Sequence, residues 1–538
     1  MEKWKDEYPR PQLKRDSFYS LNGEWLLNGE KVNVPFPPEA LLSNYNKKLE
    51  DCFSYEKTFH FDINGINDEQ VILHFGAVDQ ICTVILNDIE IGKHEGGYLP
   101  FCFDITKQLK EENVLIVKVK DDLSHVYPYG KQRKDRGGMW YTPVSGIWQT
   151  VWMEKVPKDY IEGIKIVPSM NSIHLHVETT AYEYKVIIRE KEIICNQKDV
   201  EIQIDDPHLW SVEDPYLYSM IIETNQDHVE SYFALREISV QNIKGHNRIC
   251  LNNKPIFLHG VLDQGYFHDG LYLPKDPIEY KRDILRMKEL GFNTLRKHIK
   301  IEPETFYYYC DKCGMIVVQD MVNNGGYNKF LDTVLPNVGI QYRPDSLFVN
   351  KEYKNCFKKN MIDTLNHLHN HPCIVVYTIF NEGWGQCCSD EMYEICKTLD
   401  PTRLYDSTSG WFKQSKSDFD SLHVYFKNKV LKGKNKVLFL SECGGFSRYI
   451  DNHVFSNALY GYGDTNSEND LTNRIIELYE KMVFPSLING LCGCIYTQLS
   501  DVEDEINGLY TYDRKVCKVN VQNFNKVWTK IKGEIEKL

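Results

Sequence analysis

The chain has 538 residues, which is too long for a single hydrophobic core, so we expect roughly three or four domains. Its formal net charge of −13 leaves no basic excess to neutralise phosphates, which argues against nucleic acids and anionic membranes as partners. With 42% hydrophobic and 26% charged residues, the composition is that of a soluble globular protein.

The start of the chain, residues 1–7, carries no apolar run, so we expect no signal peptide. No run of 18 apolar residues occurs, so we also expect no membrane-spanning helix. The sixteen cysteines then predict free thiols in a reducing cytoplasm. Cys310 and Cys313 form one Cys-x-x-Cys pair, and without a second pair we interpret them as helix thiols rather than a zinc ribbon.

The first part of the chain is rich in short strand-like runs. Between about residues 16 and 156, apolar runs such as 71–75, 83–86 and 114–119 alternate with turn residues. This spacing predicts an antiparallel β-sandwich, which we assign to residues 1–156. Further short runs, such as 172–177 and 184–188, follow up to about residue 240. Residues 157–240 therefore suit a small immunoglobulin-like sandwich.

After about residue 241, strand-like runs alternate with helical patterns. Asp276, Pro277 and Glu279 open a helix in a capping-box arrangement, and Gly291 closes it. A second helix runs from Pro303 to Gly314, and a third is marked by apolar residues of one face at 357, 361, 365 and 368. The expected strands are 255–259, 292–295, 315–319, 374–380, 404–407, 422–425, 437–441 and 494–498. Eight strands in this rhythm predict one (β/α)8 barrel over residues 241–538.

Two glutamates stand at the ends of two of these strands. Asn381-Glu382-Gly383 follows the fourth strand, and Glu442 ends the seventh. The carboxyl ends of barrel strands are where such barrels keep their active sites. Sugar hydrolysis by double displacement needs two carboxylates, one to protonate the leaving oxygen and one to attack the anomeric carbon. The pair therefore indicates a glycosidase.

Several motifs occur in an order that resembles glycoside hydrolase family 2, the family of β-galactosidases, β-glucuronidases and β-mannosidases. The blocks are LNGEW at 21–25, HFGAVD at 74–79, HEGGYLPF at 94–101, GIWQ at 146–149, PHLWS at 207–211, NEG at 381–383 and SE at 441–442. The resemblance covers nearly the whole chain. It implies a sugar-binding jelly roll, then an immunoglobulin-like sandwich, then a catalytic TIM barrel.

The resemblance implies roles for three residues beside the catalytic cleft. Glu382 corresponds to the general acid/base. The alternative is that Glu382 is only a surface carboxylate that follows a strand. Glu442 is interpreted as the nucleophile. The alternative is that Glu442 only forms an ion pair with a neighbouring basic residue. Asn381 is similar to the family asparagine that hydrogen-bonds the sugar 2-hydroxyl, and its alternative role is to cap the turn.

Other polar and aromatic residues at the strand ends are candidates for substrate binding. Tyr425 and His423 share one face, as do Arg296 and His298, because residues two apart in a strand point the same way. We expect Tyr425 to donate a hydrogen bond to Glu442 and Arg296 to orient the Glu442 carboxylate. The alternative for Tyr425 is an aromatic residue of the barrel rim, and the alternative for His423 is a histidine of the core.

Two aspartates and two aromatic residues complete this list. Asp263 follows the first strand and Asp320 the third, so each is a candidate to grip sugar hydroxyls or simply to cap a loop. Trp411 and Tyr496, at the fifth and eighth strand ends, are candidates to stack on apolar sugar faces.

The sequence narrows the substrate only in part. β-Glucuronidases of the family carry an Asn-x-Lys motif after the nucleophile, and none follows Glu442, which disfavours a uronic acid. We therefore predict a cytoplasmic, retaining exo-glycosidase that acts on a carbohydrate and is β-galactosidase-like. An arabinosidase or another β-glycosidase is the alternative, as are a transglycosidase and a non-catalytic carbohydrate-binding protein.

Other features of the site stay open at the level of sequence. The Asn- and Gly-rich segment 321–346 is the best candidate for a loop on the substrate side. We predict no cofactor, and a divalent cation is left open although no ligand cluster is visible. A homo-oligomer is compatible with the sequence.

Overall fold

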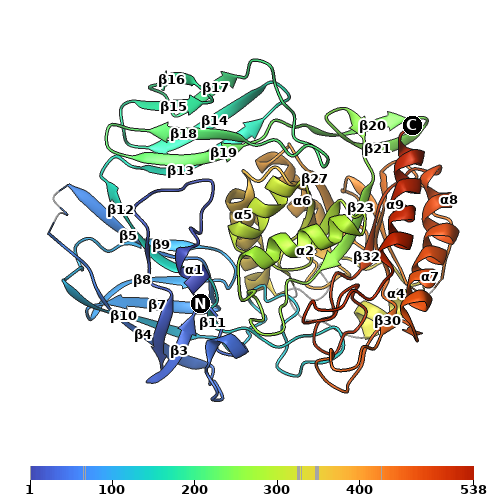
Figure 1. Ribbon diagram of the computed structural model, residues 1–538, viewed down its shortest axis with the longest axis horizontal. Coiled ribbons are helices and arrows are strands. Elements are labelled where there is room, and N and C mark those ends of the chain that lie inside the picture. The colour runs from blue at the N-terminus through green and yellow to red at the C-terminus, as the bar shows by residue number, and fades with distance from the viewer. Residues whose placement is uncertain are drawn as a thin grey trace.

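The protein consists of two β-sandwiches that lie against one side of a barrel (Figure 1). The computed structural model describes residues 2–64, 66, 68–323, 328, 330–337, 339–345, 350–425 and 427–537. The predicted fold class is thereby confirmed, while the domain limits at 156/157 and 240/241 stay a prediction.

The N-terminal sandwich packs two antiparallel sheets around its own apolar core. In β10 (Glu112–Lys120), buried Leu115, Val117 and Val119 alternate with exposed residues, which is the period of a half-buried strand. The larger sheet has the order β3 (Glu30–Val34), β2 (Gly23–Leu27), β4 (Cys52–His60), β10, β7 (Ile81–Leu86), β8 (Ile89–Glu95). The smaller has β1 (Tyr19–Ser20), β12 (Val151–Pro157), β5 (Glu69–Phe75), β9 (Phe101–Asp104), and β6 (Val78–Asp79) pairs β11 (Gly146–Ile147).

The middle domain is the immunoglobulin-like sandwich that its short strands predict. Its two sheets enclose a separate apolar cluster that includes Ile173, Val177, Val186 and Ile222. One sheet has β13 (Ile161–Pro168), β14 (Ser172–Thr179), β17 (Asp199–Gln203). The other has β16 (Lys191–Cys195), β15 (Tyr184–Ile188), β18 (Tyr218–Glu223), β19 (His228–Phe233). A three-stranded sheet of β20 (Ile238–Ile243), β21 (His246–Leu251) and β22 (Lys254–Pro255) then leads to the barrel.

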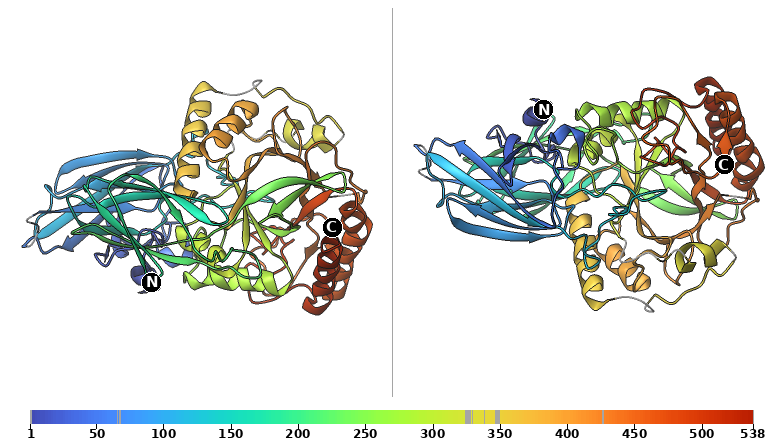
Figure 2. Two further views of the ribbon diagram at one scale, coloured as in Figure 1. Left: turned by 90° about the horizontal axis from the view of Figure 1, so that it is seen from above. Right: turned by 90° about the horizontal axis from the view of Figure 1, so that it is seen from below.

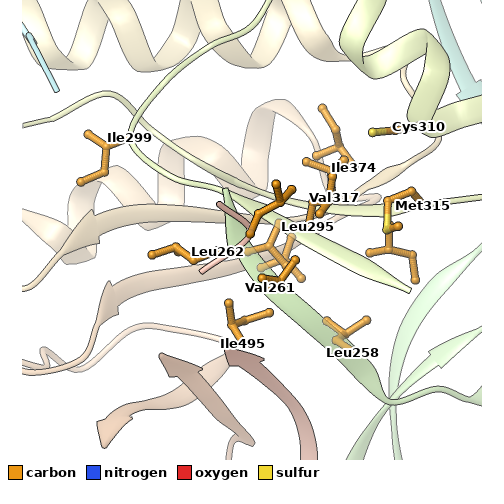
Figure 3. Close-up of a cluster of buried hydrophobic side chains, with 14 of the residues drawn as sticks. Leu258, Val261, Leu262, Leu295, Ile299, Cys310, Met315, Val317, Ile374 and Ile495 are labelled. Carbon is orange, nitrogen blue, oxygen red and sulfur yellow. The ribbon is translucent and has the colours of Figure 1, made fainter. Parts of the chain in front are cut away.

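Eight parallel strands form the barrel, as the sequence predicts. In chain order they are β23 (Leu258–Asp263), β24 (Thr294–Lys297), β25 (Ile316–Asp320), β26 (Ile374–Asn381), β27 (Leu404–Ser409), β28 (Phe419–Val424), β29 (Val437–Gly444) and β32 (Leu491–Thr497). Apolar side chains of neighbouring strands, among them Val261, Leu295, Val317 and Ile495, pack together in the buried cluster of Figure 3. The first strand begins later than expected, because residues 254–255 belong to the antiparallel sheet with β21.

Helices surround the barrel, and the longest, α5 (Lys351–Leu368), buries Phe357, Met361, Leu365 and Leu368 as predicted. The other helices of ten or more residues are α2 (Ile278–Glu289), α3 (Glu304–Cys313), α6 (Ser389–Leu399), α7 (Glu468–Leu478) and α9 (Val521–Ile535). Gly314 closes α3 with a left-handed φ of 65°. Asp276 caps the start of α2 as expected, since its Oδ1 accepts from the Ile278 N–H at 3.2 Å, but Glu279 pairs with Arg282 and does not complete the capping box.

The short elements complete the chain. They are α1 (Glu2–Asp6), η1 (Leu41–Ser43), η2 (Phe330–Val334), α4 (Leu335–Asn337), β30 (Ser447–Arg448), β31 (Asp464–Thr465), η3 (Tyr479–Val483) and α8 (Phe484–Leu487). All sixteen cysteines are free, and Cys310 and Cys313 are thiols of α3 as predicted. Among the helices in the described ranges, none combines the length and the apolar character that a bilayer crossing requires.

Candidate active site

Glu382 and Glu442 meet at the carboxyl end of the barrel. Glu382 directly follows β26, and Glu442 lies near the end of β29. His423, at the end of β28, stands between them, with Nδ1 2.7 Å from Glu382 Oε1 and 3.6 Å from Glu442 Oε2. One carboxylate oxygen of each glutamate lies within 4.8 Å of the other. The two strand ends that the sequence singles out therefore bring their carboxylates side by side.

The backbone at Glu382 turns sharply out of its strand. Its φ is +51°, a left-handed conformation that non-glycine residues seldom adopt, and Gly383 follows with φ +78°. The turn is fixed because the Glu382 N–H donates to the Ser409 carbonyl at 3.0 Å and Trp411 Nε1 donates to the Glu382 carbonyl at 3.2 Å. Such strain at a strand end is typical of functional sites, where it aims a side chain.

The surroundings of Glu442 favour its ionised form. Burial on its own would raise the pKa of Glu442, but His423 and Arg296 beside it hold that pKa well below its usual range. Arg296 Nη1 donates to Glu442 Oε1 at 3.0 Å, and the Tyr425 hydroxyl donates to Oε2. Glu442 is thus a carboxylate at neutral pH, with one oxygen atom held on each side.

Glu382 titrates in the opposite direction. Burial raises the pKa of Glu382 above its usual range, the nearby charge of Glu442 raises it further, and the contact with His423 only partly offsets this. Its side chain is 11% exposed, against 6% for Glu442. Since burial is so similar, the difference between the two glutamates comes from their neighbours.

Arg296 connects three of the predicted site residues. Its guanidinium is fully buried and donates to Asp320 at 3.0 and 3.1 Å, to Glu442, and to Asn381 Oδ1 at 2.9 Å. Asp320 in turn lies 2.6 Å from His298 Nδ1. Burial lowers the pKa of His298 to about 4, so this ring is neutral at pH 7. Asp320 is therefore occupied by Arg296 and His298 and has no exposed surface for a sugar.

Asn381 keeps a donor free. Its Oδ1 accepts from Arg296, which leaves the Nδ2 amide buried without a hydrogen-bond partner in the described part of the chain. An unsatisfied buried amide is costly unless a bound molecule completes it.

Two predicted residues do not join this group. Asp263 is held by Lys297 Nζ at 2.6 Å and by the Gly265 N–H at 2.9 Å, so it acts as a loop cap and ion-pair partner. Tyr496 is fully buried, and its ring packs beneath Gly444. Tyr496 therefore cannot stack on a sugar, contrary to expectation. The next residue of β32, Thr497, is the one that contacts Tyr425.

Trp411 does lie at the site, although it is buried rather than open to solvent. Its indole is 7% exposed, and its ring centroid is 5.5 Å from that of His423. The ring thus forms one wall beside the glutamates.

The structure adds residues that the sequence did not indicate. Tyr462 stacks on Tyr425 at 4.5 Å, and Trp384 packs against Trp140 of the N-terminal sandwich at 5.2 Å. Lys131, also from that sandwich, interacts electrostatically with both Glu382 and His298. Trp384 could have been predicted from the sequence, because it follows Glu382 by two residues. Lys131 could not, because no neighbouring motif indicates a role for it.

The predicted substrate-side segment 321–346 is described only in part, because 324–327, 329, 338 and 346 lie outside the described residues. Its last residues contact the site: Arg343 Nη2 donates to the Gly383 carbonyl at 2.8 Å, and its guanidinium lies 4.3 Å from the Phe412 ring centroid.

Glu382, His423 and Glu442 also form a group that could hold a metal ion, the single such group of three or more in the part of the chain that the structure describes. The Glu442 oxygens are already engaged by Arg296 and Tyr425, so these residues are a poor fit to a cation.

Comparison with known proteins places all three domains. The family profile "Glycosyl hydrolases family 2, TIM barrel domain" matches residues 241–435. "Glycosyl hydrolase 2 galactose-binding domain-like" matches 26–155, and "Glycosyl hydrolases family 2" matches 167–236.

Relatives with different names match the chain at similar levels. A β-galactosidase of Thermoanaerobacter pseudethanolicus is 25% identical over 408 residues, which is 70% of this chain and 51% of the relative. A β-glucuronidase of Streptococcus agalactiae serotype V is 24% identical over 449 residues, covering 74% and 72%. The chain thus spans about half the length of that β-galactosidase.

A solved structure shares the fold over almost its full length. The β-glucuronidase of an uncultured Clostridium sp. superimposes with a TM-score of 0.77 at 20% identity, covering 96% of this chain and 99% of that one.

Proposed function

The chain belongs to glycosyl hydrolase family 2, and we propose that it is a retaining exo-β-glycosidase in which Glu442 is the nucleophile and Glu382 the general acid/base. The observation that carries this proposal is the pair of neighbouring carboxylates whose pKa values are displaced in opposite directions. Such a pair assigns one group to proton donation and the other to attack.

The reaction proceeds in two displacements. Glu382 gives its proton to the glycosidic oxygen while the Glu442 carboxylate bonds to the anomeric carbon, and the bond from that carbon to the leaving group breaks. Water then attacks the anomeric carbon, Glu382 accepts a proton from it, and the bond to Glu442 breaks. Arg296 and Tyr425 hold the Glu442 oxygens, so the carboxylate is aimed before the sugar arrives.

The separation of the two carboxylates supports retention of configuration. Their closest oxygens lie within 4.8 Å, whereas an inverting enzyme keeps its carboxyl groups about 6.5–9.5 Å apart to admit a water molecule. The Nδ2 amide of Asn381, which has no partner in the described part of the chain, supports a substrate-binding role for Asn381: a hydrogen bond to the sugar hydroxyl beside the anomeric carbon. Because the amide is already oriented by Arg296, this bond costs little reorganisation.

β-Galactosidase-like activity is our first assignment for the sugar, with an arabinosidase or another β-glycosidase as the alternative. Relatives named β-galactosidase and relatives named β-glucuronidase match equally well, so similarity does not separate the two. The absence of an Asn-x-Lys motif after Glu442 favours a neutral sugar over one that this motif would bind.

The test is a panel of chromogenic aryl glycosides with the wild-type protein and variants at the two glutamates. Glu442→Gln should lower turnover by about 10⁴-fold or more, and Glu442→Gly should regain activity with azide as the replacement nucleophile. Glu394→Gln, an exposed glutamate of α6, is the matched control and should behave as wild type. Proton NMR of the first product should show the β-anomer.

Two results would defeat the proposal. Near-normal activity of Glu442→Gln would remove the nucleophile assignment, and an initial α-anomer would remove the retaining mechanism. Sugar binding without hydrolysis of any glycoside would instead indicate a carbohydrate-binding protein, and transfer to an added alcohol in preference to water would indicate a transglycosidase.

A further inference from the structure

Lys131 is a buried cation without an acceptor. It lies in the segment that joins β10 to β11 of the N-terminal sandwich, and it is 8% exposed. Within the described ranges its Nζ forms no hydrogen bond or ion pair. The ring centroids of Trp384 and Tyr141 are 5.4 and 5.8 Å from Nζ, close to the limit of about 6 Å for cation–π contacts. The Nζ atom is not among the fully buried side-chain atoms that lack a partner, so it is still open to solvent and can donate to a molecule bound there.

The segment around Lys131 is fixed on its N-terminal side by the barrel. The Gly130 N–H donates to the Asn323 carbonyl, just after β25, at 3.0 Å. Gly130 has a φ of +68°, and a Cβ there would come within 2.8 Å of the Ile299 carbonyl, so this close approach requires glycine. Gln132 Nε2, on the other side of Lys131, donates to Asp79 at 2.9 Å. The Lys131 backbone is therefore held from both sides.

The same segment is attached a second time to the loop after β32. The Thr142 N–H donates to Glu503 Oε1 at 3.1 Å, the Tyr141 hydroxyl donates to Glu505, and Arg136 pairs with Asp504 at 3.2 Å. Figure 2 shows this teal part of the chain reaching from the sandwich to the barrel. Since two separate barrel loops hold it, the segment presents Lys131 at a defined place.

That place is the group of residues around the glutamates. The Lys131 Nζ lies 5.4 Å from the ring of Trp384, two residues after Glu382, and it interacts electrostatically with Glu382 and with His298, which directly follows β24. The other basic side chains nearby are engaged: Arg296 by Asp320 and Glu442, and Lys297 by Asp263 and Glu302. Lys300 is likewise held by Glu302, and Arg343 by Asp332. Unlike these four side chains, Lys131 has no acceptor among the described residues, so its ammonium group can give hydrogen bonds to a bound molecule.

We infer that Lys131 is a substrate-binding residue, whose ammonium group donates to an oxygen atom of the terminal sugar, so that the N-terminal sandwich takes part in choosing that sugar. The inference rests on the proposed function. A hydroxyl and a carboxylate oxygen are both acceptors for an ammonium group, and the substrates used in the test separate them.

The decisive experiment compares wild type with Lys131→Met on aryl β-galactosides that each lack one hydroxyl group of the sugar. The oxygen that Lys131 contacts should be recognisable by non-additivity: deleting it should lower wild-type kcat/KM by about 30-fold or more, but the Lys131→Met variant by less than about threefold. An aryl β-glucuronide added to the series identifies a carboxylate partner, since Lys131→Met would then lose activity on this substrate above all others.

Two further variants separate binding from structure. Lys134→Met removes an exposed lysine of the same segment, which pairs with Asp51, and should match the wild type throughout. Lys131→Arg keeps the positive charge but replaces the compact ammonium group with a planar guanidinium group, so its kcat/KM values should fall between those of wild type and Lys131→Met. The thermal midpoint of each variant is measured, and the Lys131→Met effect must appear in the pattern across sugars rather than as a uniform loss of active protein.

The outcomes distinguish this inference from the proposed function. If Lys131→Met shifts the basic limb of the pH profile and lowers kcat/KM equally for every sugar, Lys131 only tunes Glu382 and the inference falls. It also falls if kcat/KM stays within about threefold of wild type on all substrates while Glu442→Gln is inactive, and the proposed function then stands. If the wild type hydrolyses no glycoside, the proposed function fails, and calorimetry with galactose and glucuronate tests Lys131 directly: equal affinity in wild type and Lys131→Met overturns it.

Discussion

Tyr425→Phe tests how the protein keeps Glu442, the proposed nucleophile, ionised, because it removes a single oxygen atom. The Tyr425 hydroxyl donates to Glu442 Oε2, while the ring stacks on Tyr462 at a centroid distance of 4.5 Å. Phenylalanine preserves this stacking, so the fold should be kept. A hydrogen bond to an ionised group contributes about 1.5–3 kcal/mol, which corresponds to roughly 10–150-fold in kcat/KM.

The pH profile gives this prediction its direction. Glu442 must be ionised to attack, so activity rises with pH as Glu442 loses its proton. Because Tyr425 is one of the groups that lower the pKa of Glu442, its removal raises that pKa and moves the acid limb of kcat/KM to higher pH.

The assay is kcat/KM for an aryl glycoside from about pH 3 to 9, with Tyr184→Phe as the control. Tyr184 also donates a hydrogen bond through its hydroxyl, to the Gln197 carbonyl at 2.8 Å, but it belongs to the middle sandwich. Unchanged activity of Tyr425→Phe, or an acid limb that moves to lower pH, would refute the assignment of Tyr425 and Glu442.

Three other substitutions separate electrostatic from structural roles. His423→Ala removes a group that lowers the pKa of both glutamates, so both limbs of the kcat/KM profile should move to higher pH; movement of the acid limb alone would contradict this. Arg296→Met leaves two buried carboxylates without their counterion, which should lower the free energy of unfolding in urea by about 3–5 kcal/mol. Asp263→Asn weakens the ion pair with Lys297 and should lower that free energy by about 1–3 kcal/mol while kcat/KM stays within about threefold; a much larger loss in kcat/KM would return Asp263 to the sugar-binding residues.

The strand ends were the part of the site that could be predicted from sequence. Eight apolar runs set the barrel, and residues after parallel strands must meet at one end, so Arg296, Asn381 and Glu442 were found together. The prediction for Tyr496 is wrong by one position in the strand. Barrel strands are buried on both faces, so an apolar run does not reveal which of two neighbours points inward, and here it is Thr497.

Contacts between domains had no comparable signal. Lys131 reaches the site because Gly130 and Gln132 fix its segment against the barrel and the first sandwich, and the partners of those contacts lie far away in the sequence. A lysine in a loop is ordinarily an exposed charge, so only the docking of one domain on another reveals its burial. The same limit applies to Trp140 beside Trp384.

The opposite pKa shifts of the two glutamates follow from the order of the strands. In the barrel sheet β29 lies between β28 and β32, so Tyr425, which directly follows β28, and Thr497 of β32 flank Glu442. Arg296 comes from β24, which is not a neighbour of β29, and it crosses the interior to reach both the Ser441 carbonyl and Glu442. Glu382 receives no such cation at hydrogen-bond distance from the described residues and keeps only His423. The two carboxyl groups are similarly buried, so their neighbours decide the outcome: the pKa of Glu442 is lowered and that of Glu382 stays raised. These opposite pKa shifts support the roles proposed for the two glutamates.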